Sequence, residues 1–449
     1  MSVIKLGEQQ QEILDSLKEF IHNGKLCISL VGFPGTGKST LVKFLLEYLN
    51  EIHFNYSLVS TTNKAALVLQ KITNDNVLTL HKLLSLSPNL EILNLDLLTL
   101  MFHSKGMNDI PKNGVIICDE ASMISDDLFD LLVEKCRDKK CKIIFVGDSK
   151  QLKPVKHTGL SKVFRVNSLI LSKVYRQDPE NKIMPILDIL RESPIDIFEA
   201  NEGDKGSLVV TNDYSKFIHS SIPKFREAID NRDILNCKMI CYTNQQVSIN
   251  NNNIRKLLFD SKEEYFKNEI IIASENIKMG NGDIINSMDY IINNTPTLSK
   301  KEIPFFCKMD GYLLDLYDSY EKKYYNTFIL SRNTSENHKH SLAALIDKLR
   351  VTAVKSVKGT KQYSMNWGNY YNLYNSFSIP FDLFYENRLI KKKTFDYGYC
   401  ITSHKSQGSS YNNIFVDIKD INKCIDDVER RQMQYVAISR TFNDVYIYQ

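Results

Sequence analysis

A glycine-rich segment near the N-terminus has the residue types and spacing of a phosphate-binding loop: Gly32-Phe33-Pro34-Gly35-Thr36-Gly37-Lys38-Ser39. Its glycines let the backbone wrap closely around a polyphosphate, and the Lys38 ammonium is placed for the β and γ phosphates. The Ser39 hydroxyl has the chemistry of a Mg²⁺ ligand. We therefore predict that ATP and Mg²⁺ bind here. The expected binding residues are Gly35, Thr36, Gly37, Lys38, Ser39 and Thr40.

Two carboxylates and one amide supply further groups for nucleotide hydrolysis. Asp119 and Glu120 directly follow an apolar run at 115–118. Downstream of a phosphate-binding loop, we interpret Asp119 as a second Mg²⁺ ligand and Glu120 as the base that orients and deprotonates the attacking water. Gln151 follows another apolar run at 141–146, and its position predicts contact with the γ phosphate from the end of a neighbouring strand.

Short apolar runs define the strands that must position these groups. Buried parallel strands are predicted at 26–31, 56–60, 115–118 and 141–146, with helical patterns between them. Because ligands of such sheets gather at the carboxyl ends of the strands, this sheet would bring the loop, the carboxylates and the amide together. A second set of runs predicts a second doubly wound domain, built from two separated stretches, at 208–210, 239–242, 414–416 and 445–448.

The length and composition restrict the class of protein. A chain of 449 residues is too long for one compact core, so about two to four packed units are expected. No stretch approaches the roughly 20 apolar residues of a membrane span, and the N-terminus has no secretory pattern. We expect a cytoplasmic protein, in the host cytoplasm if the source is viral. The nine cysteines lack metal-site spacing, and a net charge of +4 does not by itself identify a nucleic-acid partner.

Further segments resemble, in order, the motor motifs of superfamily 1 helicases, especially the RecD-like branch and, within it, the phage Dda-type helicases. The resemblance covers most of the chain, at 6–10, 59–66, 79–84, 171–176 and 241–244, and at Ile401-Thr402-Ser403-His404-Lys405-Ser406-Gln407-Gly408-Ser409 and Tyr435-Val436-Ala437-Ile438-Ser439-Arg440-Thr441. The last two segments distinguish a helicase from the many other proteins with a phosphate-binding loop.

The resemblance implies roles for individual residues. Gln10 would bind the adenine. Because Gln9 and Gln11 flank it, the alignment with the glutamine motif could also shift by one residue to either of them. Arg176 would reach the γ phosphate, and Arg440 would complete the ATP site from the second domain. The DNA path would follow Thr62, Asn63, Thr79, His81, Asn244, Thr402, His404 and Lys405. Members of the family usually have proline where this chain has Thr61.

The resemblance also implies an α/β fold with two RecA-like P-loop motor domains and two small insertions. The first motor domain would comprise 1–84 and 112–178, and the second 179–259 and 395–449. Residues 85–111 would form a β-ribbon pin at the DNA fork. Phe102 is the candidate for its aromatic tip, and packing in a small satellite core is the alternative. Residues 260–394 would hold a small β-barrel that closes over the DNA.

Two features of the second insertion have alternative interpretations. Its many tyrosines and Trp367 either stack on bases, as aromatic residues do in single-strand binding proteins, or form the core and surface of the barrel. The run Lys391-Lys392-Lys393 either contacts phosphates or is a solvated surface segment.

We expect an ATP-dependent DNA helicase that moves 5′-to-3′ along single-stranded DNA and unwinds duplex, in replication or recombination. Single-stranded DNA, forked DNA and a single-strand binding protein are the expected partners of a monomeric, phage-type protein. Two alternatives stay open: an RNA helicase or nucleic-acid-stimulated NTPase of a related viral branch, and an ATP-controlled clamp that does not step. The presence of both Glu120 and Arg440 argues against the clamp.

Overall fold

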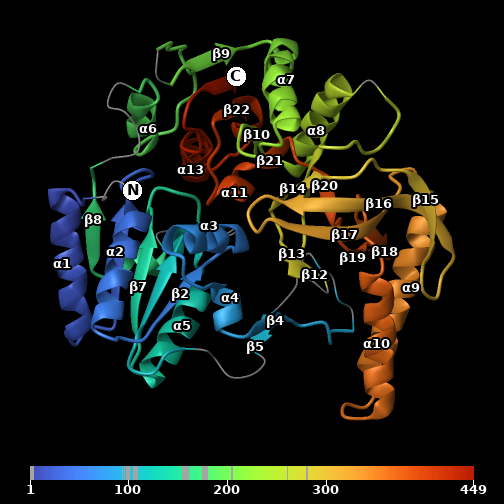
Figure 1. The fold of residues 1–449 in the computed structure, drawn as a ribbon, viewed down its shortest axis with the longest axis horizontal. Coiled ribbons are helices and arrows are strands. Elements are labelled where there is room, and N and C mark those ends of the chain that lie inside the picture. The colour runs from blue at the N-terminus through green and yellow to red at the C-terminus, as the bar shows by residue number, and fades with distance from the viewer. Residues whose placement is uncertain are drawn as a thin grey trace.

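The computed structural model describes the chain except for residues 1–4, 94, 96, 98–101, 105–109, 154–160, 174–180, 204–205, 260 and 280–281. Two parallel sheets with flanking helices lie next to a third, antiparallel sheet, as Figure 1 shows. The predicted α/β architecture with parallel sheets is therefore confirmed. Within the described part of the chain, no helix combines the length and the apolar character needed to cross a membrane.

The first sheet is parallel and six-stranded. In spatial order its strands are β3 (Val77–Thr79), β2 (Tyr56–Ser60), β6 (Val115–Asp119), β7 (Lys142–Gly147), β1 (Cys27–Gly32) and β8 (Ser168–Leu171). Its helices are α1 (Glu8–His22), α2 (Lys38–Glu51), α3 (Asn63–Thr73), the short α4 (Leu80–Leu83) and α5 (Asp126–Asp138), with 3-10 turns η2 (Ala121–Met123) and η3 (Lys162–Arg165). This unit lies at the lower left of Figure 1.

The apolar pattern explains why this sheet forms. Strand β6 is apolar at every position before Asp119, and its first four residues are completely buried because helices cover both faces of the sheet. On α2, Leu41, Leu45 and Leu49 recur every four residues and are also completely buried. These two elements place the phosphate-binding loop and the acidic pair at one edge of the sheet.

The second parallel sheet has the strand order β21 (Cys400–Thr402), β10 (Cys237–Cys241), β22 (Asn413–Asp417), β23 (Val445–Tyr448) and β9 (Leu208–Thr211). Its helices are α6 (Met184–Leu190), α7 (Tyr214–Asp230), α8 (Asn244–Leu258), α11 (Ser403–Ser406), α12 (Ile418–Ile421) and α13 (Asp427–Ile438). As predicted, the sheet combines two stretches that lie far apart in the sequence. It lies above the first sheet in Figure 1.

Between these two stretches the chain forms an antiparallel sheet. Its strands are β15 (Leu298–Glu302), β16 (Lys308–Asp318), β14 (Asp289–Ile292), β11 (Ile270–Ala273) and β20 (Phe395–Tyr397), with β17 (Lys323–Leu330) paired to β16. Two hairpins accompany it: β12 (Ile277–Met279) with β13 (Gly282–Ile284), and β18 (Leu383–Tyr385) with β19 (Arg388–Lys391). Two long helices, α9 (Glu336–Lys355) and α10 (Lys361–Asn375), pack as a helical hairpin. The sequence reading did not include this helical hairpin, and the β-barrel stays a prediction.

The tyrosines of this region do not share one environment. Tyr325 and Tyr370 are buried in the core, whereas Tyr324 and Tyr371 are exposed. Lys391 is buried, and its Nζ donates a hydrogen bond to Phe377 O at 3.1 Å. Of the three consecutive lysines, this one therefore contacts the protein interior.

A short two-stranded ribbon interrupts the first domain. Strand β4 (Leu86–Pro88) pairs antiparallel with β5 (Phe102–Ser104). The residues that follow β4 contact the helical hairpin: Arg350 NH2 donates to Leu93 O at 2.7 Å, and the Lys358 ammonium lies 2.6 Å from a Glu91 carboxylate oxygen. Figure 1 shows the ribbon between the first sheet and α10. The first domain and the antiparallel region are therefore connected through this segment.

Candidate nucleotide site and nucleic-acid interface

The phosphate-binding loop lies between β1 and the first turn of α2, as predicted. Gly37 caps α2 with φ 83°, and a Cβ at this position would lie 2.4 Å from Gln10 Nε2, so only glycine fits. Lys38 Nζ donates to Gly32 O at 2.7 Å and to Phe33 O at 3.0 Å, which holds the ammonium over the loop. The backbone N–H groups at the start of a helix and the helix dipole make this a suitable anion site.

Three carboxylates surround the Lys38 ammonium. Burial lowers the pKa of Lys38, and the negative charges of Asp148, Glu120 and Asp119 oppose this shift. Burial and the neighbouring Glu120 charge raise the pKa of Asp119 from 3.8 to about 6. The charge on Asp119 is therefore poorly compensated by the protein itself, which favours binding of a cation there.

The donor set at this edge fits Mg²⁺ bound together with phosphate. Ser39 lies in the first turn of α2, and Asp119 ends β6. One hydroxyl and one carboxylate suit Mg²⁺, which usually keeps several waters and takes further oxygens from a nucleotide. Across the described residues, no group of three or more His, Cys, Asp or Glu side chains could hold a metal ion. An ion at this place would therefore need ligands from the phosphates.

Asp148 is a residue of this site that the sequence reading did not select. It follows β7 directly and is only 1% exposed. Its Oδ1 accepts from Lys150 N at 2.9 Å, and its Oδ2 accepts from Tyr435 OH of the second domain at 3.0 Å. The sequence signal that could have identified Asp148 is its position directly after the apolar run at 141–146, because side chains at the carboxyl ends of neighbouring parallel strands share one site. Gln151 is buried three residues on, and its Oε1 has no hydrogen-bond partner among the described residues.

The second domain approaches the loop with arginines. The positive charge of Arg440 contributes to the lowered pKa of Lys38, so the two groups lie near each other. The Arg440 guanidinium is buried and donates to Val436 O, Ser409 O and Ser439 Oγ of its own domain. The Arg191 guanidinium lies 3.8 Å from the ring centroid of Phe33 in the loop. Arg176 lies outside the described residues.

Of the three candidate glutamines for adenine recognition, Gln10 contacts the phosphate-binding loop, whereas Gln11 donates to Asp15 within α1. Gln10 is buried, its Oε1 accepts from Gly7 N at 3.0 Å, and its Nε2 donates to Thr36 O at 3.1 Å. Gln9 Nε2 donates to Ser172 Oγ at 2.9 Å, beyond the end of β8. The side chain of Gln10 therefore lies directly against the phosphate-binding loop, and its role as the adenine reader stays a prediction.

The predicted strand-binding residues of the second domain meet at the carboxyl ends of β10 and β21. Asn244, Thr402 and Lys405 line one small cavity, together with Lys393 and Asp396 from the antiparallel region. Burial and the charges of Lys392 and Lys393 lower the pKa of Lys405 to about 8. Burial also lowers the pKa of His404, against the charge of Glu429. Crowded lysines of this kind favour an anion such as a backbone phosphate.

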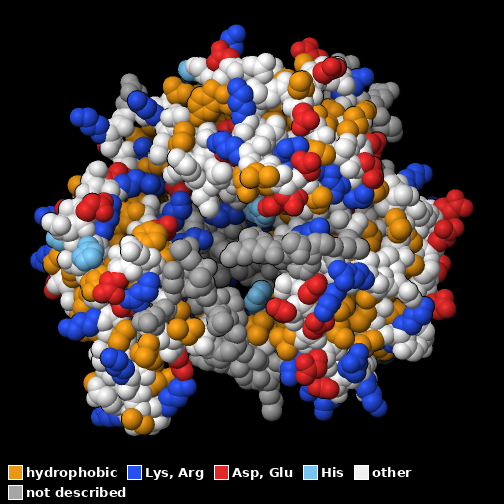
Figure 2. Space-filling model, turned by 180° about the vertical axis from the view of Figure 1, so that it is seen from behind, with side chains coloured by type: hydrophobic (Ala, Val, Ile, Leu, Met, Phe, Trp, Pro, Cys, Tyr) orange, Lys and Arg blue, Asp and Glu red, His pale blue; other side chains and the backbone are white. Residues whose placement is uncertain are grey.

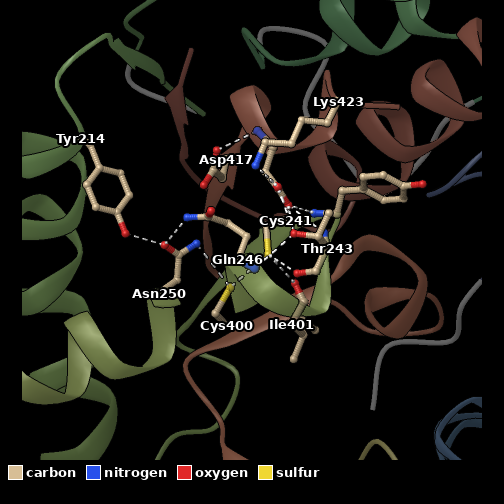
Figure 3. Close-up of polar contacts among 11 residues, drawn as sticks. Tyr214, Cys241, Thr243, Gln246, Asn250, Cys400, Ile401, Asp417 and Lys423 are labelled. Atoms are coloured by element: carbon tan, nitrogen blue, oxygen red, sulfur yellow. Dashed lines mark hydrogen bonds and ion pairs between the residues drawn. The ribbon is translucent and has the colours of Figure 1, made fainter. Parts of the chain in front are cut away.

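A polar network beneath this cavity holds the start of α8. Thr243 caps α8, and its backbone N–H and hydroxyl both donate to the buried carboxylate of Asp420, at 2.7 and 3.0 Å. Asn250 on the same helix accepts from Tyr214 OH at 2.7 Å. Figure 3 shows Thr243, Asn250 and the neighbouring thiols of Cys241 and Cys400 at this place. The network holds the start of α8, where Asn244 lies, and Asn250 Nδ2 donates to Cys400 Sγ of β21 at 3.8 Å.

In the first domain, the predicted strand-binding residues follow two neighbouring strands. Thr62 caps α3 by accepting from Ala65 N at 3.2 Å, and Thr79 caps α4 by accepting from Lys82 N at 3.2 Å. Asn63 Nδ2 donates to Asn276 Oδ1 of the antiparallel region at 3.2 Å. Burial lowers the pKa of His81, which lies in α4.

The opposite face of the molecule is hollowed near its centre, and Lys, Arg and His side chains gather around the hollow (Figure 2).

Phe102 belongs to β5 by its backbone, which pairs with Pro88. Its role at a fork stays a prediction.

Two domain families match the sequence. The AAA domain matches residues 5–202, and the UvrD-like helicase C-terminal domain matches residues 397–448. The chain is 25% identical over 471 residues to the ATP-dependent DNA helicase dda of Enterobacteria phage T4, covering 99% of this chain and 100% of that protein. It is also 25% identical over 496 residues to an uncharacterized protein of Acanthamoeba polyphaga mimivirus, covering 96% of this chain and 97% of that protein.

Among solved structures, the crystal structure of the Pif1 helicase from Candida albicans is similar to this chain. The TM-score is 0.53 at 13% sequence identity, and the superposition covers 100% of this chain and 95% of the other. At this identity the likeness is one of fold.

Proposed function

Because the chain belongs to the superfamily 1 helicases of the RecD/Pif1-like branch, to which Dda is related, we propose that it is an ATP-dependent DNA helicase that translocates on single-stranded DNA. The observation that carries the proposal is the meeting of two parallel-sheet domains at the phosphate-binding loop. Asp148 of the first domain and Tyr435 of the second share a hydrogen bond there. A nucleotide bound to the loop would therefore act on both domains at once.

Each group at the loop has a chemical task in hydrolysis. Lys38 binds the β and γ phosphates, and Glu120 orients the attacking water and accepts its proton. Arg440 lies on the second domain and stabilises the negative charge that develops on the transferred phosphoryl group. Ser39 and Asp119 would hold Mg²⁺, which screens the phosphate charge. Gln151 and Arg176 contact the γ phosphate, and Gln10 contacts the base.

Translocation follows from the positions of the two strand-binding sets. Thr62, Asn63, Thr79 and His81 belong to the first domain, and Asn244, Thr402, His404 and Lys405 to the second. Closing the nucleotide cleft moves these sets toward each other, and hydrolysis releases them. We propose that a strand lies across both sets and that the protein advances along it in the 5′-to-3′ direction, with one cycle of closing and opening per ATP.

Strand separation is the task we propose for the β4–β5 ribbon, with Phe102 at the fork. Arg350 of α9 and Lys358, in the connection between α9 and α10, anchor the segment after β4, and Tyr363 of α10 donates to Glu91 Oε1 at 3.1 Å. A force on the ribbon would therefore act on the helical hairpin as well as on the first domain. The antiparallel region closes over the strand as a barrel-like cover. A monomer carries all of these parts, and a single-strand binding protein is the proposed partner for the separated strand.

The decisive experiment is ATP hydrolysis measured without nucleic acid, with single-stranded DNA and with RNA of the same sequence. Stimulation by DNA, and its loss in Lys38→Ala with an unchanged unfolding temperature, is the expected result. Stimulation by RNA alone would show that the proposed function is wrong and that the protein is an RNA helicase or an RNA-stimulated NTPase. Lack of stimulation by either nucleic acid would contradict a nucleic-acid motor. If DNA stimulates hydrolysis but forked DNA is not unwound, the protein would be a translocase that does not separate strands.

A further inference from the structure

Thr61 and Glu120 meet because two neighbouring strands end at the same level. Strands β2 and β6 are parallel, and their register pairs Ser60 with Asp119, the last residue of each strand. The residue that follows β2 is therefore Thr61, and the residue that follows β6 is Glu120. Thr61 Oγ1 donates a hydrogen bond to Glu120 O at 3.1 Å. The contact joins a residue of the strand-binding segment to the backbone of the proposed catalytic base.

Glu120 has a backbone conformation that needs support. Its φ of 52° lies in the left-handed region, which is disfavoured for a residue with a Cβ. Three hydrogen bonds hold it there. Glu120 N donates to Asp119 Oδ1 at 2.9 Å, and Glu120 O accepts from Met123 N at 3.3 Å and from Thr61 Oγ1. Such a conformation persists only when its surroundings hold it, so loss of one bond would loosen the Glu120 carboxylate.

The other side of Thr61 is the strand-binding segment. Thr62 follows it and caps α3, and Asn63 contacts Asn276 of the antiparallel region. A strand bound at Thr62 and Asn63 therefore fixes the backbone that carries the Thr61 hydroxyl. The Thr61 hydroxyl therefore connects the strand-binding segment to the Glu120 carbonyl.

We propose that Thr61 is a positioning residue that transmits strand binding to Glu120. The inference rests on the proposed function, because it requires a nucleic-acid strand at Thr62 and Asn63. With the strand bound, the Thr61 hydroxyl holds the Glu120 carbonyl and thereby orients the carboxylate toward the attacking water. Thr61 itself touches neither the nucleotide nor the reacting atoms in this role.

The test uses the full chain with Thr61→Val, which keeps the shape of the side chain and removes the donor, and Thr61→Ser, which keeps the donor. The kcat and KM for ATP are measured with and without a saturating oligothymidine, and the Kd for the same strand by fluorescence anisotropy. Thr61→Ala is a second variant without the donor, in case valine impairs folding. Thr352→Val is the matched control, because Thr352 is an exposed threonine of α9 whose hydroxyl donates to Lys348 O of the same helix at 2.8 Å.

In Thr61→Val, the ratio of stimulated to basal kcat is expected to fall about fivefold, the factor that one hydrogen bond supplies. The KM for ATP and the Kd for the strand stay at the wild-type values, and Thr61→Ser and Thr352→Val keep the wild-type ratio. An unchanged ratio in Thr61→Val and Thr61→Ala would overturn the inference, as would a Kd that weakens in parallel with the ratio. A wild-type protein that no strand stimulates would instead overturn the proposed function itself.

Discussion

Replacing Asp119 by asparagine is expected to abolish ATP hydrolysis and, at pH 8, to make the protein more stable. In the folded chain the pKa of Asp119 is about 6 instead of 3.8, because burial and the Glu120 charge disfavour its ionised form. The folded state therefore binds this proton more tightly than the unfolded state. Ionised Asp119 destabilises the fold at pH 8. This penalty starts to decline as the pH falls below about 6 and is lost once the pH is below 3.8, where the group is protonated in the folded and unfolded states alike.

The size of the effect follows from the same shift. A rise in pKa from 3.8 to about 6 corresponds to at most about 3 kcal/mol. Asp119 is only partly buried, so screening by water reduces the expected gain to about 1–2 kcal/mol. For a domain of this size each kcal/mol raises the Tm by about 2–4 °C. Asparagine keeps an Oδ1 to accept from Glu120 N, so that local hydrogen bond is retained.

The assay is thermal unfolding without nucleotide and with a chelator, at pH 8 and at pH 4.5. Asp119→Asn should raise the Tm at pH 8 and have a much smaller effect at pH 4.5, where folded wild-type Asp119 is almost fully protonated. Asp127→Asn is the control, because Asp127 is an exposed carboxylate on α5 whose neutralisation should change stability by less than about 0.5 kcal/mol. A variant that is no more stable than the wild type at pH 8, or equally stabilised at both pH values, would refute the reasoning.

Three further outcomes are expected. Strand affinity should weaken as the pH rises from 7 to 9, because Lys405 has a pKa of about 8 and loses its charge; anisotropy titrations should show this dependence, and Lys405→Ala should lack it. Phe102→Ala should impair unwinding of forked DNA more than strand-stimulated hydrolysis, and equal losses would reject the pin. Tyr435→Phe leaves the buried Asp148 with one donor fewer, a loss of about 1.5–3 kcal/mol. It should lower kcat/KM for ATP about tenfold or more, and its effect should not add to that of Asp148→Asn.

The apolar strands and their chemistry could be read from the sequence because both are local patterns. A strand such as 115–118 is a continuous apolar run, and the helical spacing of Leu41, Leu45 and Leu49 is equally visible along the chain. Both parallel sheets were predicted from such runs. The helical hairpin of α9 and α10 was not, because α10 is rich in tyrosine and asparagine and both helices have only a weak apolar periodicity.

The sequence by itself determined the phosphate-binding loop, the acidic pair and the order of the motor motifs, because each is a short pattern of neighbouring residues. The tertiary structure decided which distant residues share an environment. Asp148 meets Tyr435 across the two domains, and Thr61 meets Glu120 through the register of β2 and β6. Lys405 has a shifted pKa only because the fold buries it beside other lysines. Hydrogen bonds and charge interactions depend on distance in space, and that distance exists only after the chain has folded.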